Sequence, residues 1–458
     1  RYNFSNNNVS IKENFPGTLL IVSTLKIIKK VELKLINMAK SVKFGYSTNF
    51  FHANDIIKTI SGLWRPASET SIFIRILYLA YIVFMYFNGC AYILCEWMMF
   101  KQMLKDIPKL LSYIGMCLTH FLGITKLGIF IFGKNIERIM NSLQDDRFKY
   151  ESLNDHGPSA MFQAEQATSS VIAYGTLGMY TFVGGSAHIS ALIKIFREVP
   201  GDTFEGTNKT CYDFMPYFFQ IPFSAETKWR CILASTFMDV GLALWAFIIS
   251  YYDGLFVGLL KCFKIQLIIA AHVLITIRER CIRKLGLNKN FEVIHDEDYP
   301  ELEQEMHKQL GKVIKHLTLL LEVRNDIETL STFVSLTQTL CSLFIFASCL
   351  YVASTVEMMS PEFFAQLQFF CCVLIQLSLI CWSANEITVA GQNIGTALYS
   401  SDWFSCSKRF KTSMILTMIR MQRPIILTIG KFTPLTITTL VNVCRGSFSY
   451  FAVFKTVK

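Results

Sequence analysis

Long uninterrupted apolar runs dominate the hydrophobic pattern of this chain. A bilayer core about 30 Å thick needs about 20 apolar residues in a helix, and residues 76–95 meet that need without one charged side chain. A second run covers residues 110–133 and contains a single charged side chain, Lys126, and a third, at residues 166–193, carries none. The pattern predicts three membrane-spanning helices in the first half of the chain.

A fourth apolar run begins near Cys231 and contains Asp239 and Asp253, and then Lys261 and Lys264. If a separate span began after Asp253, the basic cluster at residues 278–284 would lie outside the cell, against the positive-inside rule. The pattern therefore favours one long helix that ends near residue 277 and projects into the cytoplasm.

Residues 329–356 and 363–385 predict spans five and six, and the loop between them carries Glu357 and Glu362 but neither Lys nor Arg. After Trp403 the chain becomes basic and amphipathic, passes Pro424 and Pro434, and ends in an apolar stretch. We expect an all-α integral membrane protein with seven transmembrane helices, the last in two pieces. Its predicted segments are a cytoplasmic N-terminal segment at 1–70, a six-helix transmembrane domain at 71–400, and an amphipathic anchor helix with the last helix at 401–458.

Loop charges and one sequon predict the orientation. Basic residues gather before the first span and at residues 278–284, and both groups belong in the cytoplasm. The sequon that starts at Asn208 lies between spans three and four, where glycosylation requires the lumenal side. Three preceding spans then place the N-terminus inside the cell, and seven place the C-terminus outside.

Two further sequons, at Asn3 and Asn8, would argue for the opposite orientation. We discount them because residues 1–37 are polar, rich in Asn at the start, and precede Met38, a plausible true start. The alternative is a genuine tail with an amphipathic helix around residues 19–36.

Composition supports the membrane class. Charged residues make up 17% of the 458 residues, against about 25% in an ordinary soluble domain. The net charge of +10 comes mostly from basic residues in short loops. This distribution indicates that they orient the chain in the membrane rather than bind nucleic acid. Most of the 14 cysteines lie inside apolar runs, so they predict neither a disulfide framework nor a zinc site. No enzymatic, cofactor or metal-binding motif is evident.

Several motifs resemble the insect odorant receptor family. They comprise an entry to span one, a pair of Pro-aromatic motifs in the third-to-fourth loop with Ser224 where the family has Asp, a group in span five, and a C-terminal pattern: Gly62-Leu63-Trp64-Arg65-Pro66, Met215-Pro216-Tyr217, Ile221-Pro222-Phe223, Trp229, His316, Gln338, Leu340, Cys341, Ala397, Tyr399, Trp403, Phe432-Thr433-Pro434-Leu435 and Ser447-Phe448-Ser449-Tyr450-Phe451. The likeness covers the chain from about Met38 to its end.

The resemblance implies a ligand-gated, non-selective cation channel that assembles with an odorant co-receptor as a hetero-tetramer in the lipid membrane. The stretch between Lys284 and Asp326 is shorter than in the co-receptor, which indicates an odour-tuning subunit. Its ligand would be a small hydrophobic volatile, and its location would be the plasma membrane of olfactory sensory neuron dendrites.

The same resemblance places the odorant pocket in the outer halves of spans two, three, four and six. By depth, the candidates are Tyr113, Met116, Cys117, His120, Tyr180, Thr181, Gly184, His188, Met238, Leu242, Phe364, Leu367 and Phe370. Each of them could instead be a packed core residue. Lys126 and Asp239 are expensive inside a bilayer, and they would either pair with one another or contact the ligand.

On a helix at about 100° per residue, Asn442, Gly446, Ser449 and Val457 all lie within about 40° of Val453. The resemblance implies that this stripe lines the central pore, with Val453 and Val457 at the hydrophobic gate and Thr456 at a polar position near the mouth. Packing of a terminal amphipathic helix inside a bundle would produce a similar stripe. Arg445 lies about 80° away and is unexplained.

Two other receptor classes compete with this interpretation. A gustatory receptor channel would usually end in a different C-terminal pattern. A G-protein-coupled receptor would need an N-terminus outside the cell.

Overall fold

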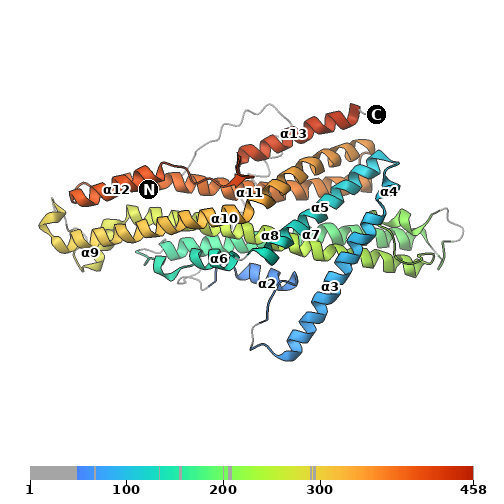
Figure 1. Cartoon of the computed structure of the whole chain (residues 1–458), viewed down its shortest axis with the longest axis horizontal. Coiled ribbons are helices and arrows are strands. Elements are labelled where there is room, and N and C mark those ends of the chain that lie inside the picture. The colour runs from blue at the N-terminus through green and yellow to red at the C-terminus, as the bar shows by residue number, and fades with distance from the viewer. Residues whose placement is uncertain are drawn as a thin grey trace.

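The computed structural model describes residues 49–66, 69–133, 135–153, 157–199, 201–204, 209–288, 291 and 295–456. Helices form most of this part of the chain (Figure 1). The predicted upstream extension and the alternative helix around residues 19–36 lie outside the described residues, as do the glycosylation candidate Asn208 and the gate candidate Val457.

The first membrane helices are close to the predicted spans. A short helix, α2 (His52–Ile60), precedes α3 (Ile72–Met98), and α4 (Phe100–Met103) leads into α5 (Ile107–Phe132). Most apolar side chains of α3, among them Phe73, Phe87 and Trp97, are exposed in the single chain. A helix that is apolar on its exposed side is suited to contact lipid.

Four long helices form the centre of the molecule: α7 (Pro158–Glu198), α8 (Lys228–Ile275), α10 (Pro300–Thr355) and α11 (Pro361–Tyr399). The 48 residues of α8 correspond to about 72 Å and the 56 of α10 to about 84 Å at about 1.5 Å per residue. Both lengths far exceed a bilayer core of about 30 Å. The unbroken α8 confirms the prediction of a single long fourth helix.

In the described part of the chain, five helices are long and apolar enough to cross a membrane, namely α3, α5, α8, α10 and α11. The uncharged stretch of α7 is less hydrophobic because it contains several Gly, Ser and Thr residues, and the 20-residue α13 (Ile437–Thr456) carries Arg445 and Lys455. The seven-helix count therefore stays a prediction.

A basic helix and a small hairpin connect α11 to α13. The basic helix α12 (Lys408–Met421) is followed by a small antiparallel hairpin of β1 (Thr428–Ile429) and β2 (Thr433–Pro434). Gly430 and Lys431 at its turn both have positive φ, as a tight hairpin turn with right-handed strand twist requires. The hairpin thus connects α12 to α13.

The remaining elements are short and mostly lie at the end of the bundle that carries α9 and α12 (Figure 1). They are α6 (Ile136–Leu143), α9 (Ile277–Lys284) and the short 3-10 turns η1 (Asp146–Phe148), η2 (Cys211–Phe214) and η3 (Asp296–Asp298). Arg278 of α9 forms an ion pair of 2.6 Å with the buried Asp296 of η3. This pair fastens the segment between α9 and α10 to the bundle.

The main core surrounds α8. Every α8 residue from 248 to 267 is buried, and α8 packs against α7, α11, α3 and α5. Because neighbouring helices cover this stretch on all sides, α8 is the central helix of the fold.

One expectation about the cysteines was wrong. Cys211 of η2 and Cys231 of α8 form a disulfide bond, although the sequence predicted no disulfide framework. The two residues are 20 positions apart, and only the fold of the loop between α7 and α8 brings them together.

Candidate functional site

A cavity lies among α5, α7, α8, α10 and α11, with one residue from the α7–α8 loop. Its volume is about 90 Å³, several times the roughly 10–15 Å³ that one water needs. The wall is mainly apolar and aromatic, as small-molecule sites usually are. The lining residues are Met116, Thr119, His120, Leu122, Tyr180, Val183, Gly184, Tyr217, Leu242, Trp245, Ala246, Ile249, Ile345, Phe369, Cys372, Val373 and Gln376.

Five of the predicted ligand residues meet in this cavity. They come from the helices that correspond to spans two, three and four, and they are Met116, His120, Tyr180, Gly184 and Leu242. Span six also contributes to the wall, through α11 residues that the sequence analysis did not select.

The other predicted ligand residues lie elsewhere. Phe364 and Leu367 are exposed, and Phe370 packs against Phe346 with ring centroids 5.1 Å apart. Thr181 lines an open groove on the outer face of α7. His188 lies 2.9 Å from the Ser235 hydroxyl through Nδ1.

The three remaining predicted ligand residues belong to small clusters that are separate from the main core. Tyr113 packs with Met99 and Met103, with Cys117 at the edge. Met238 is fully buried beside the disulfide loop.

Sequence reasoning missed Trp245, Phe369 and Gln376. A glutamine within an apolar span is a usable signal, because an uncompensated polar group is costly in hydrocarbon. The two aromatic residues carried no such signal in a chain with 39 Phe and 6 Trp residues.

A buried polar network forms one end of the cavity. Lys126 Nζ of α5 lies 2.6 Å from Asp253 Oδ1 of α8, and both side chains are almost fully buried. Asp253 Oδ2 also accepts hydrogen bonds from the Tyr180 hydroxyl at 2.9 Å and from Gln376 Nε2 at 2.6 Å. Gln338 Nε2 of α10 donates to Gln376 Oε1 at 3.0 Å. The network thus joins α5, α7, α8, α10 and α11.

This network corrects one expectation. Lys126 pairs with Asp253 rather than with Asp239, which lies near Gly184 instead. The two aspartates are 14 positions apart on α8, which is about 21 Å along the helix axis, so the level at which α5 packs against α8 decides which of them Lys126 reaches.

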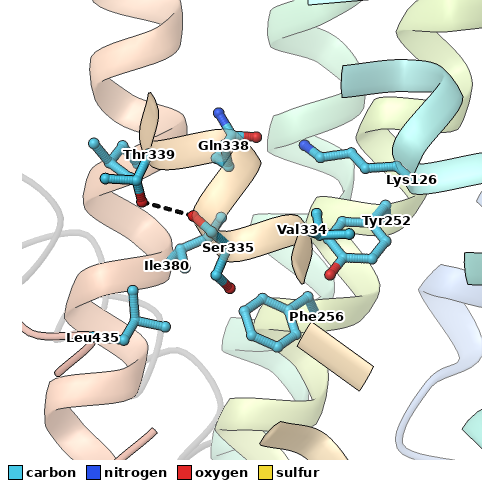
Figure 2. A pocket seen from close by; sticks show the side chains of 10 residues that line it. Lys126, Tyr252, Phe256, Val334, Ser335, Gln338, Thr339, Ile380 and Leu435 are labelled. Atoms are coloured by element: carbon cyan, nitrogen blue, oxygen red, sulfur yellow. Dashed lines mark hydrogen bonds between the residues drawn. The ribbon is translucent and has the colours of Figure 1, made fainter. Parts of the chain in front are cut away.

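A second, much smaller cavity continues from the network toward α13. Its volume is about 10 Å³, close to the size of one water. Figure 2 shows Lys126 extending toward the α10 segment that carries Ser335, Gln338 and Thr339. Leu435, two residues before α13 begins, closes the other side. Polar groups therefore extend from the first cavity into the second, which Leu435 separates from α13.

The last helix packs on α10 and leaves one face open. Its Phe454 ring lies 6.2 Å from Phe344 and 6.3 Å from Tyr351 of α10. A Cβ at Gly446 would lie 2.9 Å from Leu343 Cδ1, so this stripe position borders the contact with α10. The exposed side carries Asn442, Arg445, Ser449, Val453 and Thr456.

Among the described residues, no group of three or more His, Cys, Asp or Glu side chains is arranged to hold a metal ion. The polar groups of the cavity are suited to hydrogen bonding.

The fold is similar to that of a solved insect olfactory receptor. The receptor OR5 of Machilis hrabei in complex with eugenol superposes with a TM-score of 0.70 at 14% identity, over 89% of this chain and 98% of that chain. A second structure of the same receptor gives a TM-score of 0.67 at 15% identity. At this identity the likeness concerns the fold alone.

Sequence relatives carry the same description. Odorant receptor 10 of Aedes albopictus is 23% identical over 32% of this chain and 40% of its own length. Odorant receptor 67a of Drosophila melanogaster is 30% identical over 24% of this chain and 27% of its own length. These matches span less than half of either relative.

The family match covers far more of the chain. A sequence model described as 7tm odorant receptor matches residues 106–448, which include every described helix from α5 to α12 and the first part of α13. The chain belongs to the odorant receptor family of the insect type.

Proposed function

We propose that the chain is the odour-tuning subunit of a ligand-gated cation channel and works with an odorant co-receptor in a hetero-tetramer. The observation that carries this proposal is the link between cavity and last helix. Tyr180 and Gln376 line the cavity and also bond to Asp253. Through Gln338 the network reaches α10, against which α13 packs.

A ligand can open the channel only if it binds the open state better than the closed state. A molecule in the cavity contacts α7 and α11 at the residues that hold Asp253. A shift of either helix changes the geometry of the network and hence the position of α10. Because α13 packs along α10, the last helix moves with it.

The open face of α13 supports its role as the pore helix. Val453 is 54% exposed in the single chain, whereas the α13 side facing α10 is buried. Four such faces around one axis would place Val453 at a hydrophobic constriction, which closes a pore by dewetting. Ser449 and Asn442, one and three turns below, would keep the pore wet.

The loop between α7 and α8 supports an inverted orientation. Disulfides form in oxidising compartments, and Cys211 and Cys231 are bonded in the loop that also carries the sequon at Asn208. Both features favour the lumenal side, which later becomes extracellular. The N-terminus then lies in the cytoplasm and the C-terminus outside.

The ligand class follows from the lining. The cavity is small, apolar and aromatic, with few polar groups, which suits a small hydrophobic volatile. The similar receptor OR5 binds eugenol, a molecule of this type.

The decisive experiment is whole-cell current recording from cells that express the chain with an odorant co-receptor. We expect odorant-evoked cation current that persists when G-protein signalling is blocked. Cells with the co-receptor alone are the control. Current that disappears with the G-protein block would reject the channel mechanism and favour a G-protein-coupled receptor. The family match argues against the gustatory alternative.

A further inference from the structure

A buried acid–imidazole pair forms part of the cavity wall. Glu96 of α3 is 1% exposed and His120 of α5 is 3% exposed. Both Glu96 oxygens lie within hydrogen-bond distance of His120 Nδ1, at 3.1 and 2.9 Å. His120 also lines the cavity, whereas Glu96 does not. The carboxyl group therefore lies behind the imidazole ring as seen from the cavity.

Aromatic side chains hold the imidazole in place. The Tyr92 ring packs edge-on against it at 5.5 Å between centroids, and the Trp245 ring lies 6.5 Å away. The Tyr113 hydroxyl donates to the Glu96 backbone oxygen at 2.8 Å, which fixes the backbone of the acid. With Nδ1 committed to Glu96, Nε2 is the ring nitrogen left for a ligand.

The net charge of the pair decides whether Nε2 is a hydrogen-bond donor or an acceptor. If Glu96 is ionised and His120 neutral, Nδ1 carries the only ring proton, Nε2 accepts, and one negative charge is buried. With one more proton the pair is neutral and holds two hydrogens. One lies in the bond between the carboxyl group and Nδ1, attached to either of them, and the other is on Nε2. A buried net charge is far more costly than a neutral hydrogen-bonded pair. Lys126, a cation of the same helix, is already paired with Asp253.

We propose that His120 Nε2–H is a hydrogen-bond donor aimed at the ligand, positioned by Glu96, and that it makes the cavity selective for volatiles with a carbonyl group. This inference rests on the proposed function, because it assigns the chemical class of the ligand to the same cavity.

Other polar groups of the wall are engaged elsewhere or do not discriminate. The Thr119 hydroxyl donates to the Gly115 backbone oxygen, and the Tyr180 hydroxyl donates to Asp253. Gln376 bonds to Asp253 and Gln338. The Tyr217 hydroxyl can donate or accept, so it favours neither an alcohol nor a ketone. His120 differs from them, because the neutral pair that it forms with Glu96 makes its Nε2 a hydrogen-bond donor.

The test uses ligands that share a skeleton and differ at one group. The probes are cyclohexanone, cyclohexanol and cyclohexane, and acetophenone, methylbenzyl alcohol and ethylbenzene. Odorant-evoked current is recorded for each with the chain and its co-receptor. We expect each ketone to act at a concentration roughly 2- to 13-fold lower than its hydrocarbon, as one net hydrogen bond allows. The alcohol should be no better than the ketone, because its oxygen accepts the same single hydrogen bond from His120 Nε2–H, and a donor at Nε2 offers nothing to the alcohol's own proton.

Three variants locate the effect. His120→Phe should remove the preference for ketones while the hydrocarbons still evoke current. His120→Gln, which restores an N–H at similar reach, should recover part of the preference and serves if His120→Phe fails to reach the surface. Tyr217→Phe is the matched control and should keep the preference.

Ketones no better than hydrocarbons, or alcohols better than ketones, would overturn the inference while leaving the odour-gated channel intact. The same holds if Tyr217→Phe, and not His120→Phe, abolishes the preference. Absence of current with every probe and with a broad odorant panel, in cells where a co-receptor agonist works, would instead reject the proposed function.

Discussion

At the scale of single residues, Gly184 determines how much room the cavity has. A Cβ at this position would lie 3.8 Å from Asp239 Oδ1, an ordinary contact, so a larger side chain fits the fold but occupies ligand space. We expect Gly184→Val to raise the half-maximal concentration for acetophenone roughly tenfold, the lower end of what one methylene is worth in an apolar pocket.

Concentration–response curves measure this change. Gly175→Val on the same helix is the matched control, because Gly175 is exposed and a Cβ there would meet no atom within 4 Å. Equal shifts in both variants would mean that the effect comes from α7 itself rather than from the cavity.

Val453 is the residue that tests the gate. A polar side chain at a hydrophobic constriction lets water remain there when the channel is closed. Val453→Asn should therefore produce a standing current several-fold above the wild-type level before any odorant is added.

The comparison variant for the gate is Ala452→Asn, which is also exposed but lies about 100° round the helix. It should leave the standing current at the wild-type level. An unchanged current in Val453→Asn at normal surface expression would place the gate elsewhere.

The depth of each residue along its membrane span could be predicted from the sequence, but the direction in which its side chain points around the helix could not. Tyr180 and Thr181 lie at nearly the same depth, yet Tyr180 lines the cavity and Thr181 the outer groove. On a helix that is apolar on most sides, the pattern does not reveal which face meets its neighbours. For the same reason Phe364 and Leu367 were selected and Phe369 was missed.

At the scale of elements, the Lys126–Asp253 pair holds α5 against α8 inside the bundle. Removing one partner of a buried pair leaves an uncompensated charge and costs about 3–5 kcal/mol. Asp253→Asn should therefore lower surface expression and the unfolding temperature in detergent. It also removes an acceptor of Tyr180 and Gln376.

The double variant Lys126→Met/Asp253→Asn removes both charges and should recover part of the lost stability. Asp239→Asn is the control on the same helix and should change the unfolding temperature much less. If the double variant is as unstable as Asp253→Asn, then the network and not the charge pair carries the stability.

Most helices could be predicted from the length of the apolar runs, and the continuity of α8 from the basic cluster that follows it. The part of α10 before residue 329 was not recognised as the same helix as span five, because charged residues are frequent there. Its buried positions, such as Leu302, Met306, Leu310 and Val313, recur at helical spacing, which is the signal that would have found it.

At the scale of the whole molecule, orientation in the membrane decides whether the cavity and the end of α13 are reached from outside. The cavity uses the first half of α8, which follows the disulfide loop, and the C-terminus lies at the same end of the molecule as that loop (Figure 1). If this loop is extracellular, then odorant access, gate and disulfide all belong to the outer side.

Two epitopes and one sequon test this orientation in intact cells. A C-terminal epitope should be labelled without permeabilisation, and an N-terminal epitope only after it, because seven predicted spans separate them. Treatment with an endoglycosidase should lower the apparent mass, and Asn208→Gln should abolish that shift. Asn3→Gln and Asn8→Gln are the matched controls and should leave it unchanged. Surface labelling of the N-terminal epitope, with glycan loss in the Asn3 or Asn8 variants, would reverse the orientation and place Val453 on the cytoplasmic side of the pore.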